Sequence, residues 1–225
     1  MTLLNKIILD LQPDAIRKTL RLPTDYDPKI PQQLADSSRE LIEARALYTI
    51  GYIEEKQAAA VKISGQGLHS QVLRKNLDRI QRVFPFVITL GARLEEKIQA
   101  ADDLLDQYYL DAVGNMALEE ARRHLKKHLQ ARFALKKMSF MAPGSLSDWP
   151  LEEQKPLFKL LGDVEAAIGV KLTGNFLMLP VKSISGIYFP VQTSFYSCQL
   201  CPRQKCEGRK ARYDEKLARE YGIEK

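Results

Sequence analysis

APGSLSDWPLEEQKPLFKLLGDVEAAIGVKLTGNFLMLPVKSISGIYF, residues 142–189, is the stretch with the clearest structural signals in the chain. It opens with Pro143-Gly144, a pair typical of a tight turn. Trp149-Pro150 then comes directly before Glu152 and Glu153. Proline suits the start of a helix, and acidic side chains in the first turn face the positive end of the helix dipole. We therefore expect a helix to begin here.

The same stretch also predicts where this helix ends and which elements come after it. Gly169 is the expected end, because glycine readily adopts the left-handed conformation that closes many helices. A short polar segment comes next, and Pro180 then leads through VKSISG into an apolar run. The predicted order is turn, helix and strand.

This order resembles the activation (reactivation) domain of cobalamin-dependent methionine synthase, the module that binds S-adenosylmethionine. Two further segments, TLGARLEEKI (89–98) and DQYYLDAVGNMALE (106–119), resemble stand-alone relatives of that domain, so the similarity spans roughly Val83 to Arg209. The shared residues of the first stretch are Ala142-Pro143-Gly144, Leu172-Thr173, Met178, Pro180, Ser185-Gly186 and Tyr188-Phe189.

The resemblance implies an α+β fold, with a twisted, mostly antiparallel sheet flanked by long helices. We expect residues 1–197 to form this activation-domain-like unit, with the resemblance concentrated in 83–197. Residues 198–225 are expected to form a cysteine-bearing, basic C-terminal extension.

The middle of the chain gives a consistent local pattern. The continuous apolar run Val83–Leu90 predicts a strand buried on both faces, and Ala92–Ala100 predicts a short helix. Apolar residues recur every fourth position from Asp102 to roughly Gln130, which predicts one long helix. Gly114 in its interior costs about 1 kcal/mol, so we expect a neighbour to pack closely against it.

The region before Val83 is less regular. Helical spacing is expected in 32–47, strands in 48–53 and 61–63 with a turn or helix start at 54–57, and a basic amphipathic helix in 68–82. Gly65-Gln66-Gly67 lacks the third glycine of a dinucleotide fingerprint, so a turn is expected there.

The resemblance also implies a site for S-adenosylmethionine. In the family, this donor lies in a shallow groove around an Arg-x-Ala/Ser-Pro-Gly-Tyr segment and a later tyrosine. Ala142, Pro143 and Gly144 match the backbone of that segment. Tyr196 falls at the later tyrosine when the chain is counted without gaps from Ser185-Gly186.

Two positions of the segment differ from the family. Phe140 stands at the arginine position and Ser145 at the tyrosine position. The arginine would pair with the methionine carboxylate, an interaction worth roughly 1.5–3 kcal/mol, or about ten- to a hundredfold in affinity. The candidate substitutes near it are Arg132, Lys136 and Lys137.

All three cysteines lie close together as C-x2-C-x4-C, at Cys198, Cys201 and Cys206. Their odd number and clustering exclude a disulfide framework. Closely spaced thiolates suit zinc or an iron-sulfur cluster, and the surrounding basic residues would lower the thiol pKa values. The alternative is a basic tail with reactive thiols and no metal. His124 and His128 are four residues apart, but neighbouring lysines favour helix-end histidines over a metal pair.

Composition is that of an ordinary globular chain, with a net charge of +6. No apolar run approaches the roughly 20 residues of a membrane span, and Met1–Leu11 lacks the features of a secretory signal. We therefore expect a cytoplasmic protein. Acidic residues interleaved in the basic tail, without an aromatic stacking platform, argue against nucleic acid as a partner.

Together these features lead to one functional expectation and two alternatives. The resemblance implies a stand-alone partner that docks on a corrinoid (cobalamin-binding) methionine synthase or related methyltransferase subunit and supports reductive remethylation with S-adenosylmethionine. The cobalamin would be held by the partner. The alternatives are a non-catalytic, metal-stapled module that binds protein or RNA, and a corrinoid reductase that uses a cysteine-bound cluster.

Overall fold

The computed structural model describes residues 1–23, 25–206 and 208–223. Its central element is strand β6 (Arg82–Thr89), in which every residue after the first is buried. The alternation of a strand sends Phe84, Phe86 and Ile88 into one core, while Val83 and Val87 pack into clusters on the other face. The prediction of a strand buried on both faces is confirmed.

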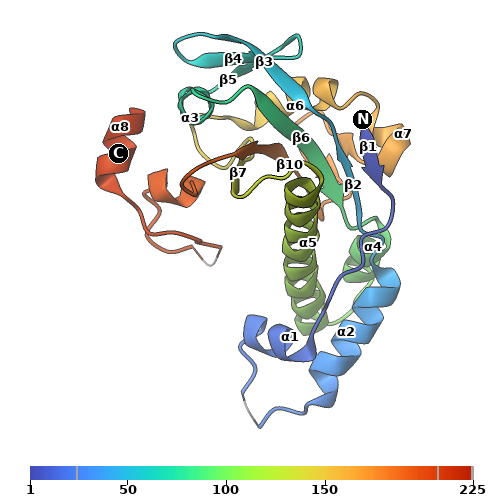
Figure 1. The fold of residues 1–225 in the computed structure, drawn as a ribbon. Coiled ribbons are helices and arrows are strands. Elements are labelled where there is room, and N and C mark those ends of the chain that lie inside the picture. Colours follow the sequence, from blue (N-terminus) through green and yellow to red (C-terminus); the bar gives the residue numbers. More distant parts are fainter. Residues whose placement is uncertain (24, 207, 224–225) are drawn as a thin grey trace.

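Strand β6 has antiparallel neighbours along both of its edges (Figure 1). Strand β10 (Ser183–Pro190) lies along one edge, and β7 (Met138–Met141) pairs with the far side of β10. Along the other edge, β2 (Arg45–Tyr48) and β3 (Gly51–Lys56) pair with β6 in one continuous register. The short gap between β2 and β3 lies opposite Pro85. The Pro85 carbonyl accepts a hydrogen bond from the Thr49 amide at 3.1 Å, but proline has no N–H to donate in return.

The sheet is completed at its ends and curls. Strand β1 (Thr2–Leu4) pairs with β2, and β3 continues into β4 (Ala60–Ile63) and β5 (Gln66–His69), which makes eight strands within the described residues. Ser64 and Gly65 join β4 to β5 with φ values of 42° and 83°. The turn expected at Gly65-Gln66-Gly67 is therefore confirmed at Gly65, whereas Gln66 and Gly67 already lie in β5. All the pairings are antiparallel.

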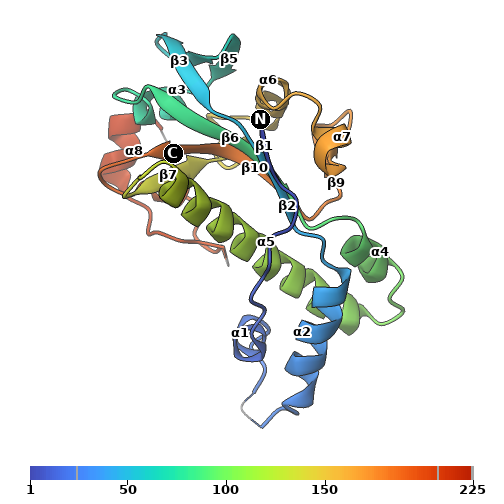
Figure 2. The same ribbon diagram turned by 45° about the vertical axis from the view of Figure 1, so that its right-hand side comes forward.

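The long helix α5 (Leu104–Arg132) crosses one face of the sheet (Figure 2). Helices α1 (Pro13–Thr19), α2 (Lys29–Leu41) and α4 (Arg93–Gln99) pack against its N-terminal part. Close packing at Gly114 is confirmed, because an added Cβ would lie 3.0 Å from Leu94 Cδ2 and 3.1 Å from Lys182 Cε. No helix in the described part of the chain is long and apolar enough to cross a bilayer.

The other face is covered by the segment between β7 and β10. It comprises η1 (Leu151–Glu153), α6 (Gln154–Leu160), α7 (Val164–Ile168) and the small pair β8 (Lys171–Leu172) and β9 (Met178–Leu179). The expected helix therefore exists but is interrupted, since Asp163 caps a new helix by accepting from the Ala166 amide. Gly169 ends it in the left-handed conformation, as predicted.

Three predictions for the first part of the chain are wrong at their boundaries. The helix expected in 32–47 ends at Leu41, and β2 starts at Arg45. The turn expected at 54–57 falls largely within β3. The helix expected in 68–82 shrinks to α3 (Gln71–Asn76), because Leu68 lies in β5 and Ser70 caps the helix by accepting from the Leu73 amide. Leu68 of β5, Leu73 of α3 and Leu77 of the turn after α3 face one core there and imitate helical spacing.

The residues after β10 return to the sheet. η2 (Ser197–Leu200) and α8 (Glu215–Tyr221) bury Leu200 and Ala218 in the cluster that also contains Trp149 and Phe189. The α+β fold with a curled antiparallel sheet and long helices is confirmed.

Candidate functional site

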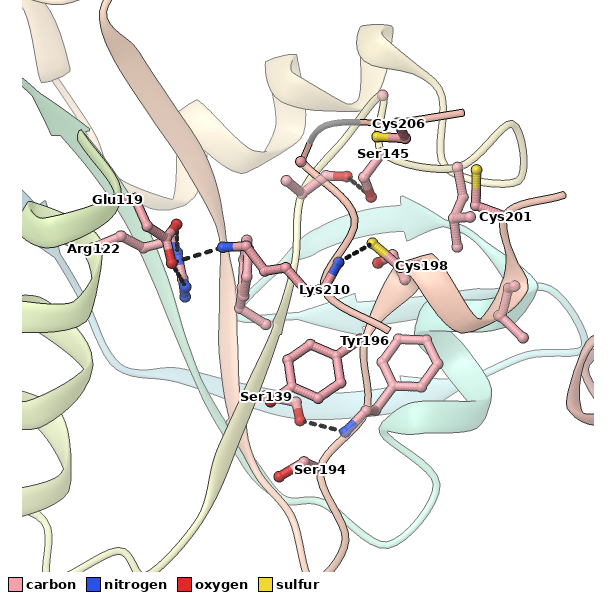
Figure 3. Close-up of a pocket in the computed structure, with 18 of the residues that line it drawn as sticks. Glu119, Arg122, Ser139, Ser145, Ser194, Tyr196, Cys198, Cys201, Cys206 and Lys210 are labelled. Carbon is pink, nitrogen blue, oxygen red and sulfur yellow. Dashed lines mark hydrogen bonds and ion pairs between the residues drawn. The ribbon is translucent and has the colours of Figure 1, made fainter. Parts of the chain in front are cut away.

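A pocket of about 820 Å³ opens where four parts of the chain meet: α5, β7, the turn after β7, and the cysteine loop, which comprises residues 198–206 and 208–211 (Figure 3). Its volume is in the range of small-molecule sites. The sequence-predicted residues Ala142, Gly144 and Tyr196 line it, together with Cys198, Cys201 and Cys206. The structure therefore brings together residues that the sequence places in two separate groups.

The Ala142-Pro143-Gly144 segment forms the turn that comes after β7. Gly144 adopts a left-handed φ of 80°, and its amide donates to the Trp149 carbonyl at 2.7 Å. The Ala142 carbonyl accepts from both the amide and the hydroxyl of Ser145, at 3.1 and 2.6 Å. Pro143 is buried and is not one of the lining residues.

The far side of this turn is fixed to the opposite face of the sheet. Asp148 accepts from the Ser70 hydroxyl and from the amides of Gln71 and Val72, at the start of α3. Glu153 accepts from the amide of His69 at 2.7 Å. The pocket wall is therefore held by bonds to elements far away in the sequence, which favours a preformed shape.

Tyr196 stands at the pocket mouth, on the connection from β10 to η2. Its side chain is exposed, and its amide donates to Gln199 Oε1 at 2.9 Å. The neighbouring Phe195 is buried, and its amide donates to Ser139 Oγ on β7 at 2.8 Å. This bond fixes the backbone beside Tyr196, whose side chain is exposed and lines the pocket.

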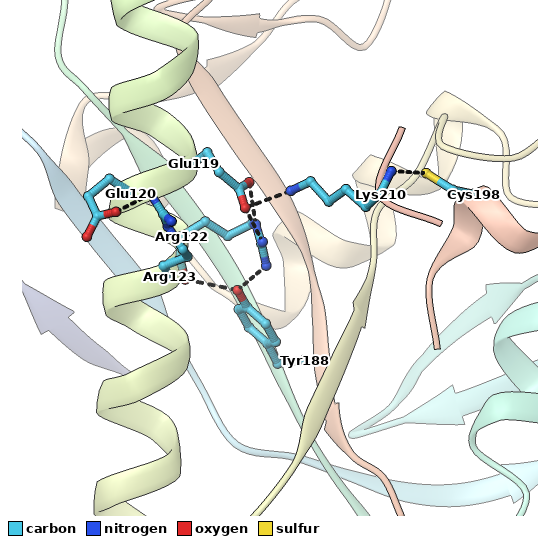
Figure 4. A network of polar contacts seen from close by, with 7 residues as sticks. All are labelled: Glu119, Glu120, Arg122, Arg123, Tyr188, Cys198 and Lys210. Atoms are coloured by element: carbon cyan, nitrogen blue, oxygen red, sulfur yellow. Dashed lines mark hydrogen bonds and ion pairs between the residues drawn. The ribbon is translucent and has the colours of Figure 1, made fainter. Parts of the chain in front are cut away.

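A polar network around the buried residues Arg122 and Tyr188 forms the inner wall of the pocket (Figure 4). Arg122 on α5 donates to both carboxylate oxygens of Glu119 and, through Nη1, to the Tyr188 hydroxyl at 2.8 Å. The Tyr188 hydroxyl donates in turn to the Arg122 carbonyl at 3.0 Å. The guanidinium carbon lies 4.2 Å from the centroid of the Phe140 ring. Lys210 approaches from the cysteine loop, with Nζ 2.6 Å from Glu119 Oε1.

The pKa values of these groups reflect their surroundings. Burial tends to raise the pKa of Glu119, but hydrogen bonds and positive charge from Arg122 and Lys210 outweigh it and lower the pKa. Burial raises the pKa of Tyr188, so the phenol stays neutral. Burial and the charge of Arg122 lower the pKa of Lys126. At neutral pH, the carboxylate of Glu119 is therefore ionised beneath a cluster of cations.

The charge of the pocket wall is strongly one-sided. Within the described residues, the charged side chains of the lining are one carboxylate, Glu119, and five cations: Arg122, Arg123, Lys126, Arg203 and Lys210. A wall of this kind attracts anionic groups. The pocket also carries apolar and aromatic surface from Met138, Phe140, Leu146 and Phe195, so it suits a ligand with both a flat apolar part and an anionic part.

The cysteine loop is organised around Arg209. Its guanidinium donates to the carbonyls of Cys198, Cys201, Arg203 and Ala211, at distances that include 3.2 Å to Cys198. The Lys210 amide lies 3.5 Å from Cys198 Sγ and donates to it. Cys198 and Cys201 are half-buried, whereas Cys206 is exposed.

The three cysteines share the pocket wall but do not form a ligand set. No three His, Cys, Asp or Glu side chains within residues 1–23, 25–206 and 208–223 lie close enough to hold one metal ion. The metal site expected at Cys198, Cys201 and Cys206 therefore stays a prediction without support from this arrangement. His128, four residues after His124, instead lies 2.9 Å from the Tyr48 hydroxyl through Nε2.

Sequence reasoning missed the two basic residues that matter most here. Arg122 and Lys210 line the pocket, whereas none of the proposed substitutes (Arg132, Lys136 and Lys137) is among the described lining residues. The available signal was the helical stripe itself, because Arg122 comes directly after the buried Ala121. A charged residue next to a buried stripe position can turn toward the core, as Arg122 does.

These features define an α+β domain with a cationic pocket beside its central sheet, and the comparisons with known proteins give it a family context. Residues 141–213 match the family described as "Vitamin B12 dependent methionine synthase, activation domain". In fold, the chain is similar to the crystal structure of the MetH reactivation domain bound to AdoHcy, with a TM-score of 0.61 and 17% identity, over 84% of this chain and 76% of that one. No curated protein sequence matches.

The resemblance to the methionine synthase activation domain is thereby confirmed in sequence over residues 141–213 and in fold over most of the chain. The sequence match runs from the turn after β7 through all three cysteines. It therefore covers most of the pocket lining but leaves out the wall that α5 provides, the β7 residues Met138, Ser139 and Phe140, and Ile223.

Proposed function

We propose that this pocket binds S-adenosylmethionine and its product S-adenosylhomocysteine. The observation that carries the proposal is that Ala142, Gly144 and Tyr196 line one pocket of about 820 Å³. Two of them belong to the turn and one to the later strand region, as in the family groove. A related fold binds AdoHcy, which supports the same ligand class here.

The lining suits such a ligand chemically. Aromatic and apolar side chains can pack against an adenine ring, and hydroxyls of Ser139, Ser145, Ser147, Ser194 and Ser197 can serve its polar edges. The cations of the inner wall can receive a carboxylate. An amphiphilic ligand therefore has a complementary surface at both ends.

The proposed role comes from the family. The domain would dock on a cobalamin-binding methionine synthase or related methyltransferase, held in a separate subunit or elsewhere in a longer chain. The cobalamin held by that partner would supply the methyl-accepting cobalt once an external reductant had delivered one electron to it. The methyl group would pass from the sulfonium of the bound donor to that cobalt, and S-adenosylhomocysteine would remain in the pocket.

A second candidate uses the cysteines for electron delivery. The specific observation in its favour is that all three line the pocket where the donor and partner would meet. It needs a redox-active iron centre to draw the thiolates together, because zinc cannot carry an electron. Metal analysis of anaerobically purified protein, with no iron found, would remove this candidate.

Calorimetric titration of S-adenosylmethionine into the reduced, anaerobically purified protein tests the main proposal. We expect micromolar binding that Tyr196→Phe weakens, because the phenol lies at the pocket mouth. Tyr108→Phe is the matched control, since Tyr108 is an exposed tyrosine of α5 outside the described lining. Absence of binding to the wild-type protein, or equal weakening by both variants, would contradict the proposal.

A further inference from the structure

A guanidinium stands above the position where the family motif has its arginine. Phe140 occupies that position on β7 and is the cross-strand partner of Tyr188 on β10. Arg122 reaches the same place from α5, with its guanidinium carbon 4.2 Å from the Phe140 ring centroid. The positive charge lost from the strand is therefore present in the pocket, supplied by a different element.

Arg122 is held rigidly and still has donors to spare. A guanidinium carries five N–H groups in a fixed plane. Two bonds go to Glu119 and one to the Tyr188 hydroxyl, which leaves two N–H groups without a partner in the described part of the chain. The residue is only 8% exposed, yet it lines the pocket. Its remaining donors are thus available to a ligand but largely shielded from bulk water.

The charges around Arg122 favour an added anion. Lys126 lies one turn further along α5 and also lines the pocket, and the charge of Arg122 helps lower the pKa of Lys126. Glu119 is the only carboxylate in the described lining, and it is shared by Arg122 and Lys210. A ligand carboxylate would reduce the repulsion among these cations.

We propose that Arg122 binds the carboxylate of the amino-acid moiety of the ligand and so replaces the arginine that the motif lacks. This assignment rests on the proposed function, because it names the ligand group that the inner wall receives. Glu119 and Tyr188 act as positioning residues, since they fix the guanidinium over Phe140. An arginine on β7 would be held at this place by its own backbone. The guanidinium of Arg122 is instead held there by stacking on Phe140.

A ligand that lacks only the carboxylate separates this role from a structural one. The test titrates AdoHcy and S-adenosyl-3-thiopropylamine, its decarboxylated analogue, into the wild-type protein and the Arg122→Lys variant. A lysine keeps the charge but cannot present paired donors in one plane. We expect Arg122→Lys to weaken AdoHcy binding by about 10- to 100-fold, and to change the affinity for the analogue much less.

The control is Arg132→Lys. Arg132 lies on the same helix and near the ring of Phe133, but outside the described pocket lining, so this variant should bind both ligands as the wild type does. Equal weakening of both ligands by Arg122→Lys, or no weakening of either, overturns the assignment and leaves the proposed function standing. A wild-type protein that binds neither ligand overturns the proposed function, and the assignment with it.

Discussion

Lys210, in the cysteine loop, places its Nζ 2.6 Å from Oε1 of Glu119 on α5. This ion pair joins two segments that are far apart in the sequence across the pocket (Figure 4). The backbone amide of the same lysine donates to Cys198 Sγ. One residue therefore connects the long helix, the pocket and the first of the three thiols.

The first prediction concerns this connection. Lys210→Ala should release the cysteine loop from α5, so the thiols of Cys198 and Cys201 should react faster with an alkylating reagent. Global stability should change by no more than about 1 kcal/mol, because both partners are partly exposed. Alkylation with subsequent peptide mass spectrometry measures the rates. Lys205→Ala, at an exposed position of the same loop outside the described lining, should leave them unchanged.

The second prediction concerns the contact between β10 and β7. A Cβ on Gly186 would lie 2.5 Å from the carbonyl oxygen of Met141, directly before the pocket turn. Gly186→Ala should therefore cost about 1–3 kcal/mol in the free energy of unfolding, measured by urea denaturation. Gly174 has open space around it, so Gly174→Ala should stay within about 0.5 kcal/mol of the wild type. Similar values for the two variants would mean that the strands are not so closely packed.

The third prediction concerns the position of the motif arginine. If Arg122 already supplies the pocket cation, Phe140→Arg brings a second guanidinium to the same place and removes the stacking ring. AdoHcy affinity should then fall or stay level, as measured by calorimetry. A gain in affinity would show that the wild-type pocket lacks a carboxylate partner and would contradict the role given to Arg122.

The fourth prediction concerns pH. Burial, and then the charges of Arg132 and His124, lower the pKa of His128 below its usual value near 6.5. The unfolded chain therefore binds the proton at higher pH than the folded chain, and stability present above about pH 6.5 is lost as pH falls through the folded-state pKa. Urea denaturation between pH 7.5 and 5 should show a steeper loss for the wild type than for His128→Gln. Parallel curves would contradict this origin.

The sequence predicts the fold best where local signals and burial agree. The apolar run at 83–90 and the four-residue repeat of α5 both correspond to single elements. The turn at Gly144 and the helix end at Gly169 are predicted correctly, because both need a left-handed φ and glycine is the residue that adopts it most readily. The prediction for the region before Val83 fails because Leu68 of β5, Leu73 of α3 and Leu77 of the turn after α3 all point into one core.

The site is predicted only in part, for a related reason. Ala142 and Gly144 are recognisable because they belong to a short family motif, and Tyr196 because it is found by counting from Ser185-Gly186. Arg122 belongs to no such motif, and only the packing of α5 on the sheet brings it to Phe140. Spacing alone gives no sign that a helix residue occupies the place of a strand residue.

The most direct test of the central claim uses the chain's own cysteines, since all three line the pocket. Reduced, chelator-treated protein is alkylated with and without saturating AdoHcy, and the rate is measured for each thiol. If the pocket binds the adenosyl ligand, AdoHcy should slow the alkylation of Cys198 and Cys201 several-fold. Unchanged rates at every AdoHcy concentration would contradict the account.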